Sequence, residues 1–141
     1  MSDAADFVAR FADFWRAPAP ERLDALLAPN VRLVAPLTPT TEDLAAGKRA
    51  FASLLRLAPD LTAEVHGWGP TPDGVLIDFT LDGSVRDVPL RWPAIDRIAL
   101  RPDGLASERI SYFDSAPLVL KALRHPRTWP AFLRSQTRHV G

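Results

Sequence analysis

The sequence contains no cysteine. Disulfide bonds, thiolate metal sites and cysteine nucleophiles are therefore excluded. It also lacks an excess of either charge, because 17 lysine and arginine residues balance 17 aspartate and glutamate residues. A net charge of zero provides no general attraction to nucleic acid or to an anionic membrane surface. We therefore expect neither as a partner.

No apolar run approaches the roughly 20 residues that a membrane-spanning helix needs. The N-terminal segment, MSDAADFVARF, is acidic and amphipathic, unlike a secretory signal peptide. Glycine-rich phosphate loops and nucleophile-elbow motifs are absent. His66, His125 and His139 do not form a metal-ligand spacing. These absences predict a cytoplasmic protein without a metal or another cofactor.

The chain has 141 residues, 47% of them hydrophobic, and is long enough to bury a core of its own. Residues 3–16 place four aromatic residues at helical spacing, which predicts an amphipathic helix. A short second helix is predicted to begin at Pro20 and close at Pro29, and a third is predicted to follow an N-cap at Thr41. Residues 31–36 are predicted to form a strand between the second and third helices.

From Leu61 onward the hydrophobic period is two, which is typical of β-strands. The predicted strands are 61–68, 75–82, 85–100 and 105–113. The turns between them are predicted at TPDG (71–74), DG (82–83) and RPDG (101–104), each with a glycine expected at a positive φ angle. Helical periodicity returns in residues 117–124 and 127–135.

This order of elements predicts an α+β fold, with helices on one side of a curved antiparallel sheet. No linker or repeat interrupts the chain, so we expect a single domain over residues 1–141. Its core covers about residues 5–120, and residues 121–141 form a C-terminal helical tail.

The segment RWPAIDRIAL, residues 91–100, carries an aspartate inside an apolar strand. Strand alternation puts Asp96 on the same face as Trp92 and Ile98. A carboxylate on an apolar face either has an ion-pair or hydrogen-bond partner or serves a chemical function. Folding the last hairpin about its PDG turn brings Asp96 opposite residues 109–111. Arg109 and Ser111 are therefore its expected neighbours.

Two interpretations of Asp96 stay open at this stage. In the first, an Asp96–Arg109 ion pair keeps the sheet in register, and the carboxylate is ionised. In the second, Asp96 lies at the base of an apolar pocket, where desolvation lets it hold a proton and act as a general acid or base.

Aromatic side chains are the candidates to line such a pocket. Trp92 shares the face of Asp96 and either stacks on a flat ligand or belongs to the core. The same two alternatives hold for four other aromatic residues: Phe11, Trp15, Phe79 and Phe113. The amphipathic end segment HPRTWPAFLR (125–134) is predicted to cover the pocket mouth or to contact a second subunit.

Residues 5–120 resemble the SnoaL-like branch of the nuclear transport factor 2 superfamily. The resemblance rests on helices around one strand, followed by a curved sheet that contains IDRIALRPDG and ends in ERISYFDSAPL. It implies a cone-shaped, curved antiparallel sheet wrapped around the N-terminal helices and enclosing a deep apolar pocket. It also implies kinship with polyketide cyclases, ketosteroid isomerases and limonene epoxide hydrolases.

The catalytic residues of these relatives are present only in part. Against the ketosteroid isomerases, Phe11 stands at the oxyanion-hole tyrosine and Ala35 at the catalytic base, while Asp96 matches the second oxyanion-hole residue. Against the limonene epoxide hydrolases, Ser111 stands at the aspartate of the final strand. The single acid/base aspartate expected of SnoaL-like cyclases matches Asp96. The resemblance therefore favours a cyclase- or isomerase-type reaction.

Three functions stay open, so the sequence does not decide whether the protein is an enzyme. The first is an enzyme acting on a small apolar carbonyl compound, with Asp96 catalytic and Arg109 and Ser111 orienting it or the ligand. The second is a protein that binds a small apolar ligand without reaction. The third is a dimeric accessory module whose cavity is filled by its own side chains. Mixed charges on the outward sheet face resemble those of relatives that pair through their sheets, so a homodimer is expected.

Overall fold

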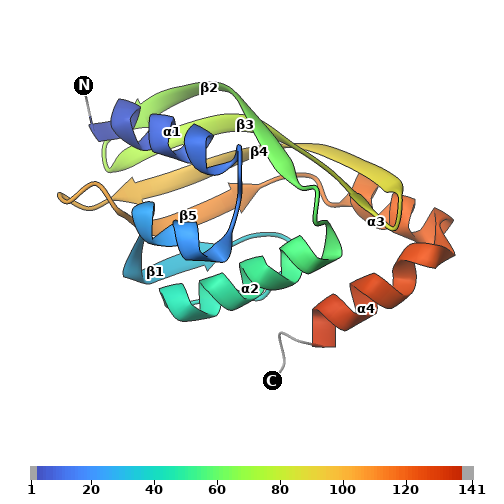
Figure 1. Ribbon diagram of the computed structural model, residues 1–141. Coiled ribbons are helices and arrows are strands. Elements are labelled where there is room, and N and C mark those ends of the chain that lie inside the picture. The colour runs from blue at the N-terminus through green and yellow to red at the C-terminus, as the bar shows by residue number, and fades with distance from the viewer. Residues whose placement is uncertain (1–2, 138–141) are drawn as a thin grey trace.

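The structure, a computed structural model, describes residues 3–137 (Figure 1). The N-terminal part contains helix α1 (Asp3–Phe14), the 3-10 helix η1 (Pro20–Ala25), strand β1 (Leu27–Val34) and helix α2 (Leu44–Leu57). Four strands follow: β2 (Thr62–Thr71), β3 (Gly74–Val85), β4 (Val88–Leu100) and β5 (Ala106–Tyr112). The C-terminal part contains α3 (Ala116–Arg124), the 3-10 helix η2 (Pro126–Thr128) and α4 (Trp129–Thr137).

Within these residues, five strands form one curved sheet in the order β1-β5-β4-β3-β2. Strand β1 runs parallel to β5, and the other neighbouring strands are antiparallel. Helix α1 packs against β2 and β3, and α2 packs against β1. The predicted α+β fold, with helices against a curved and mainly antiparallel sheet, is confirmed. No helix within residues 3–137 is long and apolar enough to cross a membrane.

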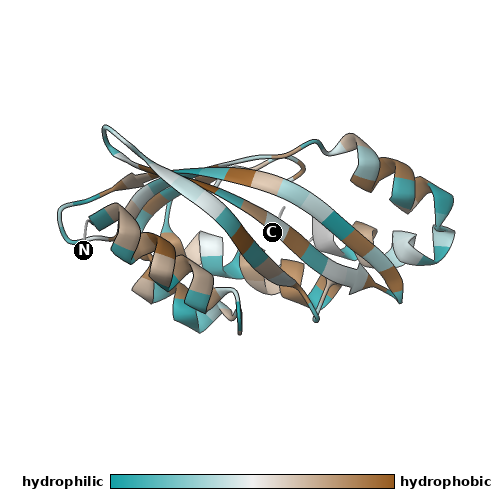
Figure 2. Ribbon diagram, turned by 90° about the horizontal axis from the view of Figure 1, so that it is seen from above, coloured by the Kyte–Doolittle hydropathy of each residue, from teal (hydrophilic) through white to brown (hydrophobic). Residues whose placement is uncertain are grey.

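The inner face of the sheet follows the alternation predicted from the sequence. Figure 2 shows this alternation as apolar and polar bands along the strands. On β3 the residues Val75, Ile77, Phe79 and Leu81 are all buried. Ile77 pairs directly with Asp96 on β4, so the aspartate lies on the buried face, as expected.

The β3–β4 turn differs from the prediction. Gly83 lies inside β3 and pairs with Leu90, whereas the turn itself is formed by Arg86 and Asp87. Their φ angles of 48° and 67° lie in the left-handed region that a tight two-residue hairpin turn requires. The DG prediction was wrong because burial of the apolar side chains beyond Gly83 extends both strands past it.

The other two predicted turn glycines serve different purposes. Gly104 has a φ angle of 83°, as predicted. Gly74 does not have a positive φ angle, and it is required by a close approach instead. A Cβ atom at Gly74 would lie 1.9 Å from the carbonyl oxygen of Ile98 on the neighbouring strand.

The N-cap of α2 is Asp43 rather than the predicted Thr41. The Asp43 carboxylate accepts a hydrogen bond of 2.7 Å from the backbone N–H of Ala46. Thr41 exchanges backbone hydrogen bonds of 2.9 and 3.1 Å with Leu33, so its backbone extends the sheet before the helix begins.

The second helix ends earlier than predicted. It stops at Ala25, and Pro29 lies inside β1. Leu27, Ala28 and Val31 are buried, and Leu27 pairs with Ala106 of β5. Pairing with β5 therefore converts the predicted end of a helix into the start of a strand.

Asp60 fixes the end of β3 through two hydrogen bonds from Ser84. The Ser84 hydroxyl donates to its carboxylate at 2.7 Å, and the Ser84 backbone N–H donates at 2.8 Å. The hydroxyl is the larger cause of the lowering of the pKa of Asp60 below its ordinary value of 3.8. A lowered pKa means that ionised Asp60 stabilises the fold above about pH 4, and that this contribution is lost as the pH falls through the folded-state pKa.

We expect Asp60→Asn to lower the free energy of unfolding by less than about 1 kcal/mol at neutral pH, because the site is exposed to solvent. The variant should also lose less stability than the wild type between neutral pH and about pH 3. Urea unfolding of both proteins at the two pH values measures this difference. An identical pH dependence in the two proteins would contradict the role given to Ser84.

Candidate functional site

A cavity of about 620 Å³ lies between the inner face of the sheet and the helices. This volume is in the range of sites that hold small organic ligands. The helices contribute mainly aromatic and aliphatic side chains, including Phe11 from α1 and Phe51 and Leu54 from α2, and Trp15 lines the cavity directly after α1. Residues 35–39, which follow β1, complete one side of the wall.

The predicted aromatic residues divide between the cavity and the core. Phe11, Trp15, Trp92 and Phe113 line the cavity, but Phe79 does not. The Phe79 ring is fully buried and meets Phe11 edge to face, with ring centroids 5.3 Å apart. Phe79 therefore belongs to the core beneath the cavity wall, because Phe11 covers it.

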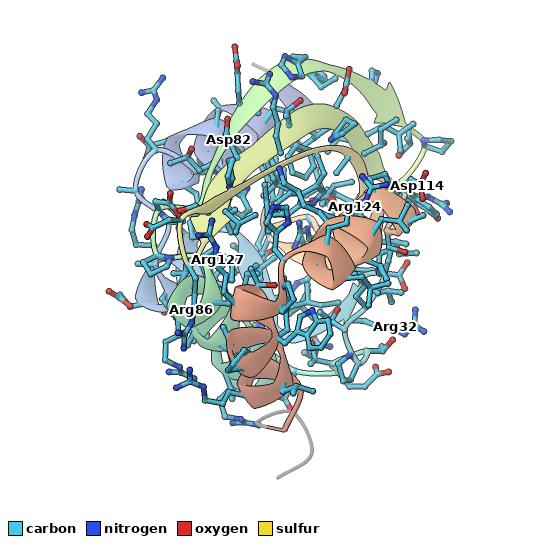
Figure 3. The ribbon with its side chains drawn as sticks, turned by 90° about the vertical axis from the view of Figure 1, so that its right-hand side faces the viewer. Arg32, Asp82, Arg86, Asp114, Arg124 and Arg127 are labelled. Atoms are coloured by element: carbon cyan, nitrogen blue, oxygen red, sulfur yellow. The ribbon has the colours of Figure 1, made fainter. Side chains whose placement is uncertain are left out.

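The C-terminal helices bring exposed apolar residues to the cavity. Val119 and Leu123 of α3 and Trp129 and Leu133 of α4 line it, yet 59% of Leu123 and 66% of Leu133 stay exposed. Figure 3 looks onto this end of the molecule, where α3 and α4 lie nearest the viewer. The segment predicted as either a cover or a subunit contact thus lies at the cavity mouth.

Arg109 is the one charged residue among the described residues that line the cavity. The charged side chains labelled in Figure 3, Arg124 and Arg127 among them, do not line it. The Arg109 Nε–H donates a hydrogen bond to Asp96 Oδ2, and 27% of the arginine side chain stays exposed. Its Nη1 and Nη2 atoms have no partner among residues 3–137. The cavity therefore contains a guanidinium with two free donor groups.

Asp96 lies directly behind this guanidinium. It is 0% exposed and does not line the cavity. Its Oδ1 atom accepts a hydrogen bond of 2.6 Å from the hydroxyl of Ser111, and its Oδ2 atom accepts from Arg109. The register pairs Asp96 with Ser111, as the hairpin argument predicted.

The structure thus contains the first of the two arrangements considered for Asp96, the buried ion pair. Arg109 and Ser111 both line the cavity and are therefore in reach of a ligand, whereas Asp96 lies behind them. Asp96 orients the side chains of Arg109 and Ser111 through these two hydrogen bonds. Its role as a catalytic acid or base stays a prediction.

Two indole groups beside the cavity have unused donors. The Nε1 atoms of Trp15 and Trp92 are buried and have no hydrogen-bond partner. A buried N–H without a partner is uncommon in folded proteins. Sequence reasoning identified both residues as pocket candidates but could not identify the unpaired donors.

Other polar candidates lie away from the cavity. The imidazole of His66 is exposed, and its Nε2 atom lies 2.7 Å from the hydroxyl of Thr80. Among the described residues no group of three or more histidine, aspartate and glutamate side chains is placed to hold a metal ion. His139 lies outside the described residues.

The contribution of α2 and of residues 35–39 to the cavity was missed by sequence reasoning. In the sequence, the helical spacing of Phe51 and Leu54 predicts only the buried side of the third helix. Both pack against the core and also line the cavity. Helical periodicity carries no signal that separates these two environments, because both are apolar.

The fold recurs in solved structures of low sequence identity. A candidate SnoaL-like polyketide cyclase from Jannaschia sp. CCS1 has a TM-score of 0.72 and 16% identity, over 83% of this chain and 89% of its own. IdmH, a candidate polyketide cyclase from Streptomyces antibioticus, has a TM-score of 0.70 and 20% identity, over 85% of this chain and 98% of its own. These likenesses show the fold.

A third structure is a protein of ketosteroid isomerase-like fold from Catenulispora acidiphila in complex with trimethylamine. It has a TM-score of 0.70 and 16% identity, over 77% of this chain and 85% of its own. No curated protein matches the sequence. Residues 8–109 match the family model described as the SnoaL-like domain. The chain therefore belongs to the SnoaL-like family.

Proposed function

We propose that this protein binds a small, largely apolar carbonyl compound in the 620 Å³ cavity, with its oxygen at Arg109. One observation carries the proposal: among the described residues, the Nη1 and Nη2 groups of Arg109 have no partner, and the rest of the lining is uncharged and mainly apolar. A hydrogen bond from a guanidinium to an oxygen acceptor contributes about 1.5–3 kcal/mol. The apolar lining supplies the remaining affinity through burial of the ligand body.

Binding is tested by filling the cavity from α2. Ala50 lines the cavity, whereas Ala45 is exposed on the same helix and does not line it. We expect Ala50→Phe to weaken the binding of 2-acetylnaphthalene at least tenfold and Ala45→Phe to leave it unchanged. Quenching of the intrinsic tryptophan fluorescence reports binding, because Trp15, Trp92 and Trp129 line the cavity. Saturable binding that Ala50→Phe does not alter would place the ligand elsewhere.

A cyclase- or isomerase-type reaction is the second candidate function. The observation that favours it is the hydrogen bond of 2.6 Å between Ser111, which lines the cavity, and Asp96 behind it. In such a reaction Ser111 Oγ takes a proton from a carbon next to the ligand carbonyl while its own hydroxyl proton passes to Asp96. The electron pair left on the ligand delocalises onto the carbonyl oxygen, where Arg109 stabilises the negative charge.

Ser111→Ala separates the two candidate functions. In an enzyme we expect it to lower kcat at least 100-fold and to leave ligand affinity within about threefold, since the loss of one positioned proton-transfer group costs about 10²–10⁴ in rate. Ligand binding without any product in the wild-type protein, after long incubation with enolisable ketones, would support the non-catalytic function.

We also propose a homodimer formed through the outer face of the sheet. Leu76, Ile95 and Tyr112 are exposed there, on three neighbouring strands, and Ile95 pairs directly with Tyr112. Exposed apolar residues that adjoin one another favour an interaction surface. Light scattering should give a dimer for the wild type and a monomer for Ile95→Glu, while Thr62→Glu at the edge of the sheet stays dimeric. A monomeric wild type would contradict the proposal.

A further inference from the structure

The polar groups of the cavity are confined to a few positions. Besides Arg109, the lining contains three hydroxyl side chains: Ser111, Thr38 and Thr41. The hydroxyl of Ser111 donates to Asp96, and that of Thr38 donates to the carbonyl of Ala35 at 3.4 Å. The other described side chains of the lining are apolar apart from the indole N–H groups of Trp15, Trp92 and Trp129. Away from these positions, a polar group on a ligand would lose water without gaining a hydrogen-bond partner.

The free polar groups near β4 and β5 are hydrogen-bond donors. Among the described residues they are the Nη1 and Nη2 groups of Arg109, and the Nε1 atom of Trp92 is also unpaired but buried. A ligand head that only accepts hydrogen bonds fits this arrangement better than an alcohol or an amine, whose own N–H or O–H would need an acceptor.

The shape of the guanidinium indicates which hydrogen-bond-accepting head group fits best. Asp96 occupies the Nε position, so the end formed by Nη1 and Nη2 stays available. Two parallel N–H donors match the two oxygens of a carboxylate, and this planar pairing is the preferred arginine–carboxylate geometry. The 27% of the Arg109 side chain that is exposed leaves this end accessible to an incoming carboxylate.

At the cavity mouth, by contrast, the lining favours an apolar part of the ligand. Leu123 of α3 and Leu133 of α4 line the cavity while 59% and 66% of them stay exposed. An apolar ligand tail beside them would remove this area from water, which favours binding. A second polar group on the ligand would instead be placed against leucine side chains.

We infer that the ligand is an amphiphilic monocarboxylate, with its carboxylate on Arg109 Nη1 and Nη2 and an uninterrupted apolar body that ends beneath α3 and α4. This inference rests on the proposed function and names its ligand class. A compound with oxygen atoms along its whole length is not expected to bind in this cavity.

Isothermal titration calorimetry with four compounds of equal chain length tests the inference. They are decanoate, methyl decanoate, decan-1-ol and decanedioate. For the wild type we expect decanoate to bind at least tenfold more tightly than each of the other three. The ester and the alcohol are uncharged and lack the pair of anionic oxygens, and the dicarboxylate places a second charge beneath α3 and α4.

The variant Asp96→Asn/Arg109→Gln removes both charges together, so that neither is left buried alone. Circular dichroism establishes that it is folded. We expect decanoate to bind it at least tenfold more weakly than it binds the wild type, and methyl decanoate to bind both within about threefold. The control Arg124→Gln alters a cation that does not line the cavity and should keep the wild-type preference.

The outcomes separate the inference from the proposed function. Equal binding of decanoate and methyl decanoate by the wild type overturns the carboxylate head and leaves the binding cavity in place. Equal binding of decanoate and decanedioate overturns the apolar tail. Loss of the preference in Arg124→Gln places the carboxylate at the mouth and overturns its position at Arg109. Failure of all four compounds and of 2-acetylnaphthalene to bind overturns the proposed function as well.

Discussion

Arg109→Ala should lower the free energy of unfolding by about 3–5 kcal/mol, more than Asp96→Ala, although both variants break the same ion pair. The asymmetry follows from burial. Asp96 is 0% exposed, so without Arg109 its charge stays buried with Ser111 as its remaining partner. Arg109 keeps 27% of its side chain exposed, so without Asp96 it can turn toward water in the cavity.

Urea unfolding of the two single variants and of the double variant Asp96→Ala/Arg109→Ala measures these effects. The double variant should be more stable than the sum of the two single losses implies, because it leaves no charge unpaired. Equal losses of unfolding free energy in the two single variants, or additive losses in the double variant, would contradict the claim that the buried Asp96 charge requires Arg109.

Gly74→Ala should be destabilising by about 3 kcal/mol or more, because its new Cβ atom would lie 1.9 Å from the carbonyl oxygen of Ile98. The atom in the way belongs to the backbone of β4, so no side-chain rotation relieves the overlap. Asp96 pairs with Ile77 in the β3–β4 ladder. A shift of β4 at Ile98 would therefore also disturb the ion pair between Asp96 and Arg109.

Gly69→Ala is the matched control, since a Cβ atom at Gly69 meets nothing within 4 Å. We expect this variant to stay within about 0.5 kcal/mol of the wild type, or to exceed it slightly through the lower entropy of its unfolded chain. Thermal unfolding of both variants followed by circular dichroism compares them. Similar melting temperatures for the two variants would contradict the contact at Gly74.

The arrangement around Asp96 was predictable because it depends on strand alternation and hairpin register. Both follow from a period of two and from a turn at PDG, and the register indeed pairs Asp96 with Ser111. The DG turn at 82–83 was predicted wrongly for a related reason. The glycine signal is local, whereas the length of β3 and β4 is set by the apolar residues Val85 and Val88, which the sheet buries.

The boundary between core and cavity could not be predicted from the same patterns. Phe11 and Phe79 are both apolar residues on inward faces, and only the position of one ring over the other leaves Phe11 in the cavity lining and Phe79 beneath it. The same limit applies to Asp96 and Arg109. Alternation places them on one face but does not determine which of them reaches the cavity.

A crystal structure of the protein grown with decanoate would test the binding cavity and its polar end together. We expect the carboxylate oxygens within hydrogen-bonding distance of Arg109 Nη1 and Nη2, and the alkyl chain along Leu54 toward Leu123 and Leu133. A ligand bound outside the cavity, or one bound with its carboxylate at α3 and α4, would contradict this arrangement.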